Sequence, residues 1–209
     1  MKGKSKSGGQ ASSLPVNPLA PIKEVRRGAE SLSHIDVAGA TYFVTFRVAE
    51  GMGGLTLAER DLVAGAIRFH DDKLYTVHAW VVMDDHVHLL VTPAAPDFDT
   101  ALPIGRVLHA IKSFTANRIN EQRGRTGRFW QSEGFDSIVD GDREFENRWS
   151  YILNNPYRRW PNLVWGEYKW IGDRYGLHET KDIEVKSMAG KMPAPLDAKG
   201  SAEVERRSQ

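Results

Sequence analysis

The residues best suited to chemistry are two histidines that flank one valine, His86-Val87-His88. They lie in an apolar, β-branched stretch that predicts a strand, where residues two apart point to the same face of the sheet. Two neutral imidazoles on one rigid face can bind a divalent cation. Asp84 and Asp85, immediately before them, add negative potential near such a cation. The alternative is a pair of polar residues at the mouth of a hairpin, with no metal.

A second candidate is a helix predicted to be capped by Asp142 and to end at Pro156. Its apolar stripe comprises Phe145, Trp149, Ile152 and Leu153. Tyr151 lies roughly 140° around the helix from the centre of that stripe, and Asn155 follows one turn later on the same face. Because the residue before a proline disfavours helical backbone, we expect Asn155 in a frayed last turn, where its amide could reach a metal. The pair could instead form an ordinary amphipathic rim.

The elements that must position these residues follow from hydrophobic patterns and turn signals. Strands are predicted at 41–47, 75–83 and 86–92, with a further strand from 129–130 and 135–139. Helices are predicted from Thr56, as the capping residue, to His70, and from Pro103, as the first helical residue, to Gln122. This order predicts an α+β fold of the ferredoxin-like kind: an antiparallel sheet with helices on one face and the other face open to a ligand.

Most of the apolar and aromatic residues singled out here are predicted to lie in the core, and three tryptophans have no assigned role. The helix positions expected in the core are Leu57, Leu62, Ala66, Phe69, Ile104, Leu108, Ile111 and Ile119. Trp130 and Trp149 are expected in the core as well. Trp160, Trp165 and Trp170 either cover the sheet or stack on bases, and the sequence does not choose between these roles.

The 209-residue chain has no cysteine, which excludes disulfide scaffolds, thiolate nucleophiles, iron–sulfur clusters and cysteine-containing zinc sites. No apolar run approaches the roughly 18 residues of a membrane span. Composition predicts a disordered basic leader at 1–23, one folded unit at 24–178 and a disordered charged tail at 179–209. No phosphate-binding glycine–lysine loop or dinucleotide fingerprint is present.

The formal net charge is only +1, but the charge is unevenly distributed. Residues 31–100 carry 4 basic and 10 acidic side chains, whereas 103–128 carry 6 basic side chains and a single acid, Glu121. The six basic residues are Arg106, Lys112, Arg118, Arg123, Arg125 and Arg128. They indicate a strip that follows a nucleic-acid backbone, with an ordinary solvated helix face as the alternative. A nearly neutral chain can therefore still bind DNA through one face.

Three blocks of sequence resemble those of one known family. They are Ala79-Trp-Val-Val-Met83 followed by His86-Val-His88, then Phe129-Trp-Gln131, then Tyr151-Ile-Leu-Asn-Asn-Pro156. In order and spacing they resemble the single-tyrosine HUH transposases of the IS200-like superfamily, in particular the REP-associated tyrosine transposases. The resemblance extends from about His34 to Tyr175. Two positions depart from the family pattern: a turn that often reads Pro-Asn here reads Asp84-Asp85, and a histidine common after the middle block is Ser137.

The resemblance implies a metal-dependent transposase that cuts single-stranded DNA next to imperfect hairpins. His86, His88 and Asn155 would be the metal ligands, with Mg²⁺ or Mn²⁺ as the metal, and Tyr151 would be the nucleophile. Attack of the tyrosine on a phosphate leaves a 5′-phosphotyrosine link and a free 3′-hydroxyl, which can reverse the reaction and join a new end. The resemblance further implies a cytoplasmic, nucleoid-associated bacterial protein, either a monomer or a homodimer.

Physical chemistry agrees with these roles, because a phenol with a pKa of about 10 needs activation by nearby positive charge to attack at neutral pH. Two other functions remain open. One is a non-catalytic, ferredoxin-like nucleic-acid-binding module, against which the presence of all four site residues argues. The other is a metal-dependent phosphoesterase that uses the histidines without a covalent tyrosine, and it predicts turnover without a protein–DNA adduct.

Overall fold

The structure is a computed structural model, and it describes residues 36–95, 102–132 and 134–176. Its strands are β1 (Tyr42–Arg47), β2 (Tyr75–Val82), β3 (His86–Pro93), β4 (Phe135–Ile138) and β5 (Ile171–Asp173). Its helices are α1 (Leu57–Phe69), α2 (Ile104–Gln122) and α3 (Gly141–Arg159). The predicted leader at 1–23 and the predicted tail at 179–209 lie outside the described residues.

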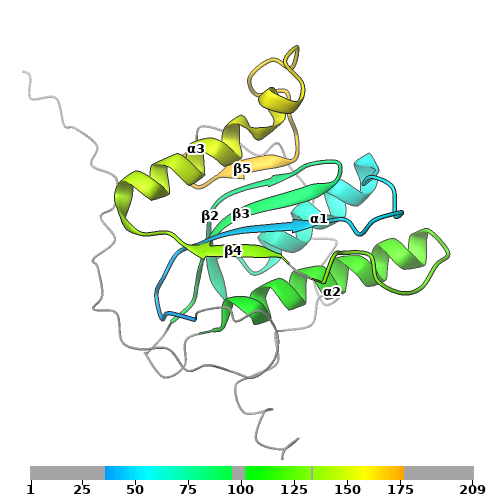
Figure 1. The fold of residues 1–209 in the computed structure, drawn as a ribbon, viewed down its shortest axis with the longest axis horizontal. Helices are drawn as coiled ribbons and strands as arrows, with labels where there is room; N and C mark the ends of the chain where they lie inside the picture. The colour runs from blue at the N-terminus through cyan, green and yellow to red at the C-terminus, as the bar shows by residue number, and fades with distance from the viewer. Residues whose placement is uncertain (1–35, 96–101, 133, 177–209) are drawn as a thin grey trace, which may run out of the picture.

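The five strands form one antiparallel sheet in the order β4-β1-β3-β2-β5. The first four strands have the order expected for two interlocked β-α-β units, in which α1 and α2 each connect strands that are not neighbours. β5 extends the sheet beside β2. Figure 1 shows the sheet lying between α3 on one side and α2 on the other. The predicted α+β class and the antiparallel sheet are confirmed.

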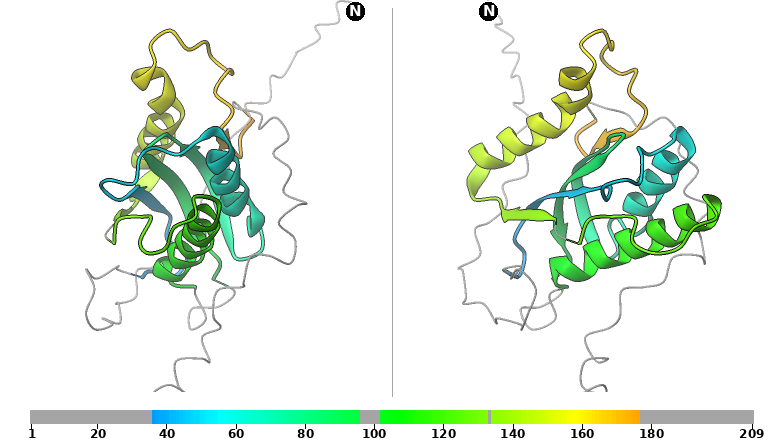
Figure 2. Two further views of the ribbon diagram at one scale, coloured as in Figure 1. Left: turned by 90° about the vertical axis from the view of Figure 1, so that its right-hand side faces the viewer. Right: turned by 45° about the vertical axis from the view of Figure 1, so that its right-hand side comes forward.

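One face of the sheet is covered by α1 and α2, and the main core lies between these layers (Figure 2). The predicted core positions Ala66, Ile104, Leu108, Ile111 and Ile119 are buried there, and Leu62 and Phe69 pack partly buried against them. The prediction for Leu57 is wrong, because this side chain is 62% exposed. It is the first residue of α1, and Val63 and Ile67 face the sheet from the following turns.

The third helix, α3, packs on the opposite face (Figure 1). A smaller second core forms there, in which Ile152 and Leu153 are fully buried. The strand residues in this core are Phe43, Ala79, Val81, Leu90 and Ile171, and Met83 joins them just after β2. Phe145 and Trp149 pack partly buried against it, as their place in the apolar stripe predicted. α3 therefore covers part of the face that the sequence analysis left open to a ligand.

The helix starts agree only in part with prediction. Thr56 caps α1 as expected: its hydroxyl accepts the N–H of Glu59 at 3.3 Å, and the Glu59 carboxylate accepts the N–H of Thr56 at 2.8 Å. Pro103, however, is the capping residue of α2 and not its first helical residue. The capping position of α3 is Asp140, not Asp142. Asp142 lies inside the first turn, where a carboxylate still interacts favourably with the helix dipole.

The end of α3 also differs from prediction, since the helix does not stop at Pro156 but continues to Arg159. The proline removes one backbone donor, but it lies at the start of the last turn, and its carbonyl accepts the N–H of Trp160 at 2.8 Å. Both the proline ring and Ile152, one turn earlier, are buried. Asn155 is therefore a helical residue and is not part of a frayed end.

Of the two segments predicted for the fourth strand, only the second forms a strand, β4. Trp130 makes a single bridge to Val48, just beyond β1. Phe129 and Trp130 are both buried in the main core, and the indole N–H of Trp130 donates to the Thr115 hydroxyl at 2.9 Å. This segment thus fills space between the sheet and α2.

Candidate active site

His86 and His88 occupy alternate positions on β3, opposite Arg47 and Thr45 of β1 respectively. Val87 between them is buried in the main core, so both histidines point to the other face, the one that carries α3. The two imidazole centroids lie 4.7 Å apart, at an interplanar angle of 72°. The same-face arrangement predicted from the period of the strand is therefore present.

His88 is buried and is held on two sides. Its Nδ1 lies 2.7 Å from the Thr45 hydroxyl, and its ring stacks on Phe43 at 5.5 Å between centroids. Burial, and then the neighbouring His86 and Arg47, lower the pKa of His88 to about 3, so its imidazole is neutral at physiological pH. Within the described parts of the chain, Nε2 of His88 is buried without a hydrogen-bond partner. A neutral ring with an unpartnered nitrogen is chemically suited to binding a metal.

His86 is less buried and has a charged partner. Its Nδ1 lies 2.6 Å from the Asp85 carboxylate, which in turn lies 3.8 Å from the Arg47 guanidinium. Burial opposes ionisation of Asp85, but the hydrogen bond from His86 and the surrounding positive charges outweigh it and lower the pKa of this carboxyl. Asp85 is thus an anion beside the histidines. Asp84 in the same turn instead pairs with Arg159 at the end of α3, at 3.5 Å.

α3 brings Tyr151 to these histidines. Its ring centroid lies 5.2 Å from that of His88 and 6.0 Å from that of Phe43, and both contacts are edge-on. Tyr151 keeps 39% of its surface exposed, whereas the next residue, Ile152, is fully buried and anchors the helix. The guanidinium of Arg158 lies 5.7 Å from the centroid of the Tyr151 ring. The structure therefore brings together the histidine pair and the tyrosine that the sequence analysis singled out.

Asn155 lies one turn after Tyr151 on α3 and is half-buried. Within residues 36–95, 102–132 and 134–176, no three His, Cys, Asp or Glu side chains are arranged to hold a metal. An amide oxygen is a ligand type that a divalent cation accepts beside imidazole nitrogens, and the unpartnered Nε2 of His88 is suited to such a cation.

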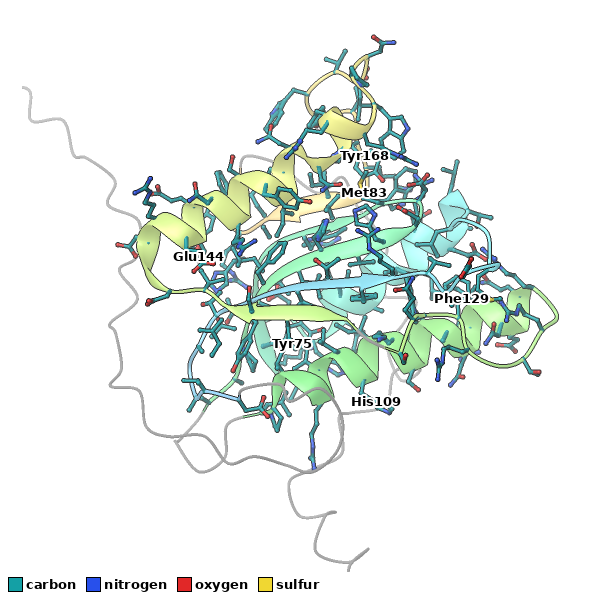
Figure 3. All side chains as sticks on the ribbon, in the orientation of Figure 1. Tyr75, Met83, His109, Phe129, Glu144 and Tyr168 are labelled. Carbon is teal, nitrogen blue, oxygen red and sulfur yellow. The ribbon has the colours of Figure 1, made fainter. Side chains whose placement is uncertain are left out.

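Three more residues of this site were not identified from the sequence. Thr45 bonds to His88, Phe43 stacks on the same ring, and the guanidinium of Arg148 lies 4.7 Å from the centroid of Phe43. Arg148 also donates to Glu144 at 3.1 Å; Figure 3 labels Glu144 near the start of α3. Strand alternation alone places residues 43, 45 and 47 on one face. Only the pairing of β1 with β3 shows that this face is the one with the histidines.

Residues 62–155 match the family model for IS200-like transposases. The matched range is less than half of the chain, but it includes His86, His88 and Tyr151 and ends at Asn155. The resemblance predicted from the sequence is confirmed. A match to a transposase family indicates a DNA-binding enzyme of DNA recombination.

Comparison with solved structures supports the same fold. Eight chains match, and one is described as the REP-associated tyrosine transposase bound to a REP hairpin. The TM-score is 0.53 at 18% sequence identity, and the match covers 78% of this chain and 93% of the other. No curated protein matches the sequence significantly. In the described parts of the chain, every helix is too short or too polar to cross a bilayer.

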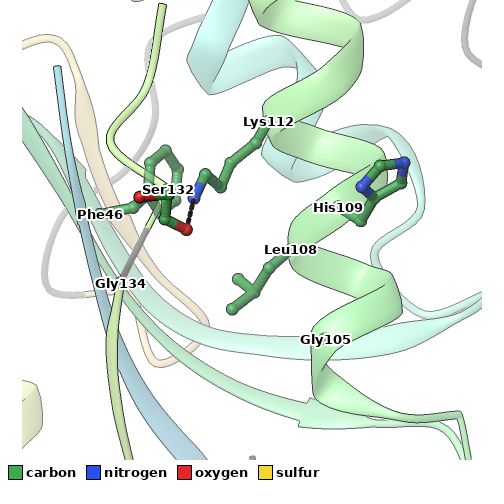
Figure 4. Close-up of a pocket in the computed structure, with 7 residues that line it drawn as sticks. All are labelled: Phe46, Gly105, Leu108, His109, Lys112, Ser132 and Gly134. Atoms are coloured by element: carbon green, nitrogen blue, oxygen red, sulfur yellow. Dashed lines mark hydrogen bonds between the residues drawn. The ribbon is translucent and has the colours of Figure 1, made fainter. Parts of the chain in front are cut away.

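The basic residues predicted to bind DNA lie in and after α2, in a different layer from the histidine pair and Tyr151. Lys112 donates to the carbonyls of Gln131 and Ser132 at 2.9 and 3.4 Å, and it lines a pocket of about 180 Å³ beside α2 (Figure 4). Burial, and then the charge of Arg128, lower the pKa of Lys112. The ammonium group thus lies next to carbonyl oxygens.

Arg123 makes structural contacts that the sequence does not reveal. Its guanidinium donates to Glu59 of α1 at 2.6 Å and to the carbonyls of Met52 and Gly54. Burial opposes ionisation of Glu59, but the hydrogen bonds from Arg123 and from the N–H of Thr56 outweigh it and lower the pKa of this carboxyl. Arg123 therefore links the end of α2 to the start of α1.

The other four basic residues have varied surroundings. Arg118 pairs with Glu121 at 2.9 Å, and Arg125 donates to the sulfur of Met52. Arg106 is half-buried near the start of α2, and Arg128 is exposed. The structure places the six cations along one helix and the loop after it, away from Tyr151.

The tryptophans fall into packed and exposed classes. Trp130 is buried as predicted, and Trp149 is half-buried. Trp160 stacks on Tyr168 at 5.5 Å, and the indole N–H of Trp170 donates to Asp61 at 2.9 Å, so both pack against the domain. Trp165 stacks on Tyr157 at 5.0 Å but keeps 53% of its surface exposed.

Proposed function

We propose that the chain is a metal-dependent single-stranded DNA endonuclease and strand transferase that acts at hairpin-forming DNA. The observation that carries this proposal is the convergence of Tyr151 on the histidine pair: its ring lies 5.2 Å from His88, whose Nε2 is unpartnered, with His86 alongside. A nucleophile beside two metal-binding imidazoles suits phosphoryl transfer through a covalent intermediate. The match to IS200-like transposases supports the same reaction.

In the proposed reaction, Oη of Tyr151 attacks the phosphorus of a DNA phosphodiester. A bond forms between this oxygen and phosphorus, and the bond between phosphorus and the 3′ oxygen breaks. The products are a 5′-phosphotyrosine and a 3′-hydroxyl, which receives the proton that the tyrosine loses. Because a phosphodiester replaces a phosphodiester, attack by a 3′-hydroxyl can reverse the step without ATP. Arg158, over the Tyr151 ring, adds positive charge beside the proposed nucleophile.

His86, His88 and Asn155 are the proposed ligands of a divalent cation, Mg²⁺ or Mn²⁺. When bound, the cation supplies positive charge that polarises the scissile phosphate. The chain contributes a neutral His88, which burial maintains, and an anionic Asp85 that favours a cation nearby. Two imidazoles and one amide oxygen leave coordination positions for phosphate and water.

The proposed partner is single-stranded or hairpin DNA, the class of ligand named for the structural neighbour. The residues proposed to contact its phosphates are Arg106, Lys112, Arg118, Arg125 and Arg128. Arg123 was also predicted to do so, but its guanidinium donates to Glu59, Met52 and Gly54 instead. The loop at 48–55 links these basic residues to the histidine turn, because the N–H of Leu55 donates to the carbonyl of Asp84 at 2.6 Å and Arg123 donates to Gly54 at 2.8 Å. DNA bound along α2 would reach Tyr151 across this end of the sheet.

The test is adduct formation on a denaturing gel, with a labelled single-stranded hairpin oligonucleotide and Mg²⁺ or Mn²⁺. We expect a covalent protein–DNA band that disappears in Tyr151→Phe. Tyr157→Phe is the matched control: it removes a phenol from the same helix, and that hydroxyl accepts the N–H of Gly166 at 3.0 Å, away from the histidines. Loss of the adduct in Tyr157→Phe alone would show that the nucleophile is assigned wrongly.

The same assay separates the two alternative functions. Metal-dependent cleavage that gives no adduct, and that survives Tyr151→Phe, would identify a phosphoesterase. Binding without cleavage, unchanged in His86→Ala, would identify a non-catalytic nucleic-acid-binding module. Either result would overturn the proposed covalent reaction.

A further inference from the structure

We propose that Asp85 and Thr45 are positioning residues that hold the proton of each histidine on Nδ1, so that both Nε2 atoms are available to one cation. The inference rests on the proposed function, since it assigns second partners to its metal-binding histidines. His86 contacts Asp85 through Nδ1, and His88 contacts Thr45 through Nδ1. Both rings use Nδ1 for this contact, so Nε2 is the remaining ring nitrogen in each.

For His86 the chemistry of the contact decides the tautomer. An ionised carboxylate has no hydrogen to donate, so Nδ1 of His86 must be the donor to Asp85 across the 2.6 Å contact. In the neutral imidazole the lone pair is then on Nε2. Asp85 is itself oriented by Arg47 at 3.8 Å, on the strand next to β3.

For His88 the partner is a hydroxyl, which can either donate or accept. If Thr45 donated, the proton of the neutral ring would lie on Nε2, which is buried and has no acceptor among the described residues. A buried N–H without an acceptor is unfavourable, and it also cannot bind a cation. If Thr45 accepts, Nε2 presents its lone pair, and a cation satisfies it. Thr45 therefore holds the proton of His88 on Nδ1, as Asp85 does for His86, but through a neutral hydroxyl.

The two partners differ in charge and burial, and this gives the histidines unequal strengths as ligands. Asp85 is a carboxylate with a half-exposed side chain, 3.8 Å from the Arg47 guanidinium, whereas Thr45 has a neutral hydroxyl and is buried. A carboxylate partner raises the basicity of an imidazole ligand more than a hydroxyl does. Thr45 thus acts mainly by fixing the orientation of His88, and Asp85 acts by orientation and charge together.

Mn²⁺ affinity of the full chain, measured without DNA by the electron paramagnetic resonance signal of free Mn²⁺, tests the proposal. We expect Thr45→Val to weaken binding by about 10- to 100-fold. Thr45→Ser, which keeps the hydroxyl, should restore most of the affinity. Thr41→Val is the matched control, because the hydroxyl of this buried threonine bonds to Thr92 at 2.7 Å and not to a histidine. Asp85→Ala should weaken binding more than Asp85→Asn, whose amide oxygen can still accept.

A second readout examines the protons directly. Long-range ¹H–¹⁵N spectra of the Mg²⁺-saturated protein should show His86 and His88 with hydrogen on Nδ1, and Thr45→Val should alter the His88 pattern alone. Wild-type affinity retained in Thr45→Val, or hydrogen on Nε2 of His88, would overturn the positioning role while the proposed enzyme stands. A wild-type chain that binds no Mn²⁺ would overturn the proposed metal site and this inference with it.

Discussion

The two faces of the sheet are built from the same strands, but their buried polar atoms without a hydrogen-bond partner lie in different places. On the α1–α2 face, the described residues with such atoms include Arg68 and Asn120, both near helix ends. On the α3 face they include the indole nitrogen of Trp149 and, in the centre, Nε2 of His88, whose ring centroid lies 5.2 Å from that of the partly exposed Tyr151. The alternation of residues along β1 and β3 therefore places the candidate site on the α3 face and the larger core on the α1–α2 face. We expect substitutions in the larger core to act mainly on stability, and substitutions of the site residues to act mainly on activity.

The largest effect expected on the α3 face is a loss of activity with little loss of stability. His86→Ala should reduce metal-dependent cleavage on the order of a thousandfold, because it removes a proposed ligand of the cation. The free energy of unfolding should change by no more than about 1 kcal/mol, since the side chain is only partly buried. Cleavage rates on hairpin DNA and urea unfolding measure the two quantities. A large fall in stability would show that the faces are not separable.

On the α1–α2 face we expect a large loss of stability with little loss of activity. Ile111→Ala truncates a fully buried side chain of α2 and should lower the free energy of unfolding by about 2–5 kcal/mol. Cleavage per folded molecule should stay near the wild-type value, because Ile111 lies across the sheet from Tyr151. Urea unfolding and rate measurement at low temperature provide the check. If Ile111→Ala reduced the specific activity as far as His86→Ala does, the expected difference between the two faces would be contradicted.

The basic residues of the α2 layer should divide into structural and DNA-binding cations. Arg123→Ala should destabilise the fold by about 3 kcal/mol, because buried Glu59 loses its charged partner. Arg128→Ala, at an exposed position, should change stability by less than about 0.5 kcal/mol. It should instead reduce the slope of log affinity against log salt concentration for hairpin DNA by about 1. Binding titrations at several salt concentrations distinguish Arg128 from an uninvolved surface residue, for which the slope is unchanged.

The α3 face should also give the fold a pH dependence in the range where histidines titrate. Burial, and then the charge of Arg174, lower the pKa of His78 to about 4, against about 6.5 in an unfolded chain. Between these values the unfolded chain binds a proton that the folded chain does not, so stability falls as pH decreases from about 6.5 to 4. The loss from this residue is about 2–3 kcal/mol. The free energy of unfolding, measured in urea at pH 7, 5.5 and 4, should fall less steeply in His78→Gln than in the wild type. The same decline in both proteins would show that His78 is not the source of this pH dependence.

What could be predicted from the sequence were features with a local physical cause. The period of two in a strand placed His86 and His88 on one face, and the period of 3.6 in a helix placed Tyr151 and Asn155 together. The capping role of Thr56 followed from Glu59 three residues later. The family resemblance joined these local features into one site, which spacing alone could not have done.

What could not be predicted depended on contacts between distant segments. Arg123 was interpreted only as a DNA-binding cation, because nothing local indicates its bond to Glu59 in another helix. Thr45 was not identified, because its role depends on the register of β1 against β3. The end of α3 was predicted wrongly because the buried Pro156 begins the last turn, where it removes one backbone donor and its carbonyl still accepts the N–H of Trp160.

The continuation of α3 past Pro156 has a consequence for strand joining. Tyr151 sits two turns before the end of a helix that Ile152 and Leu153 anchor, so a DNA end attached to its oxygen would share the rigidity of the domain. Holding one reactant in fixed geometry raises its effective concentration toward the other, up to about 10⁵–10⁸ M in well-oriented systems. In the proposed reaction, rejoining therefore depends on the stiffness of this helix as well as on the reactivity of the phosphotyrosine.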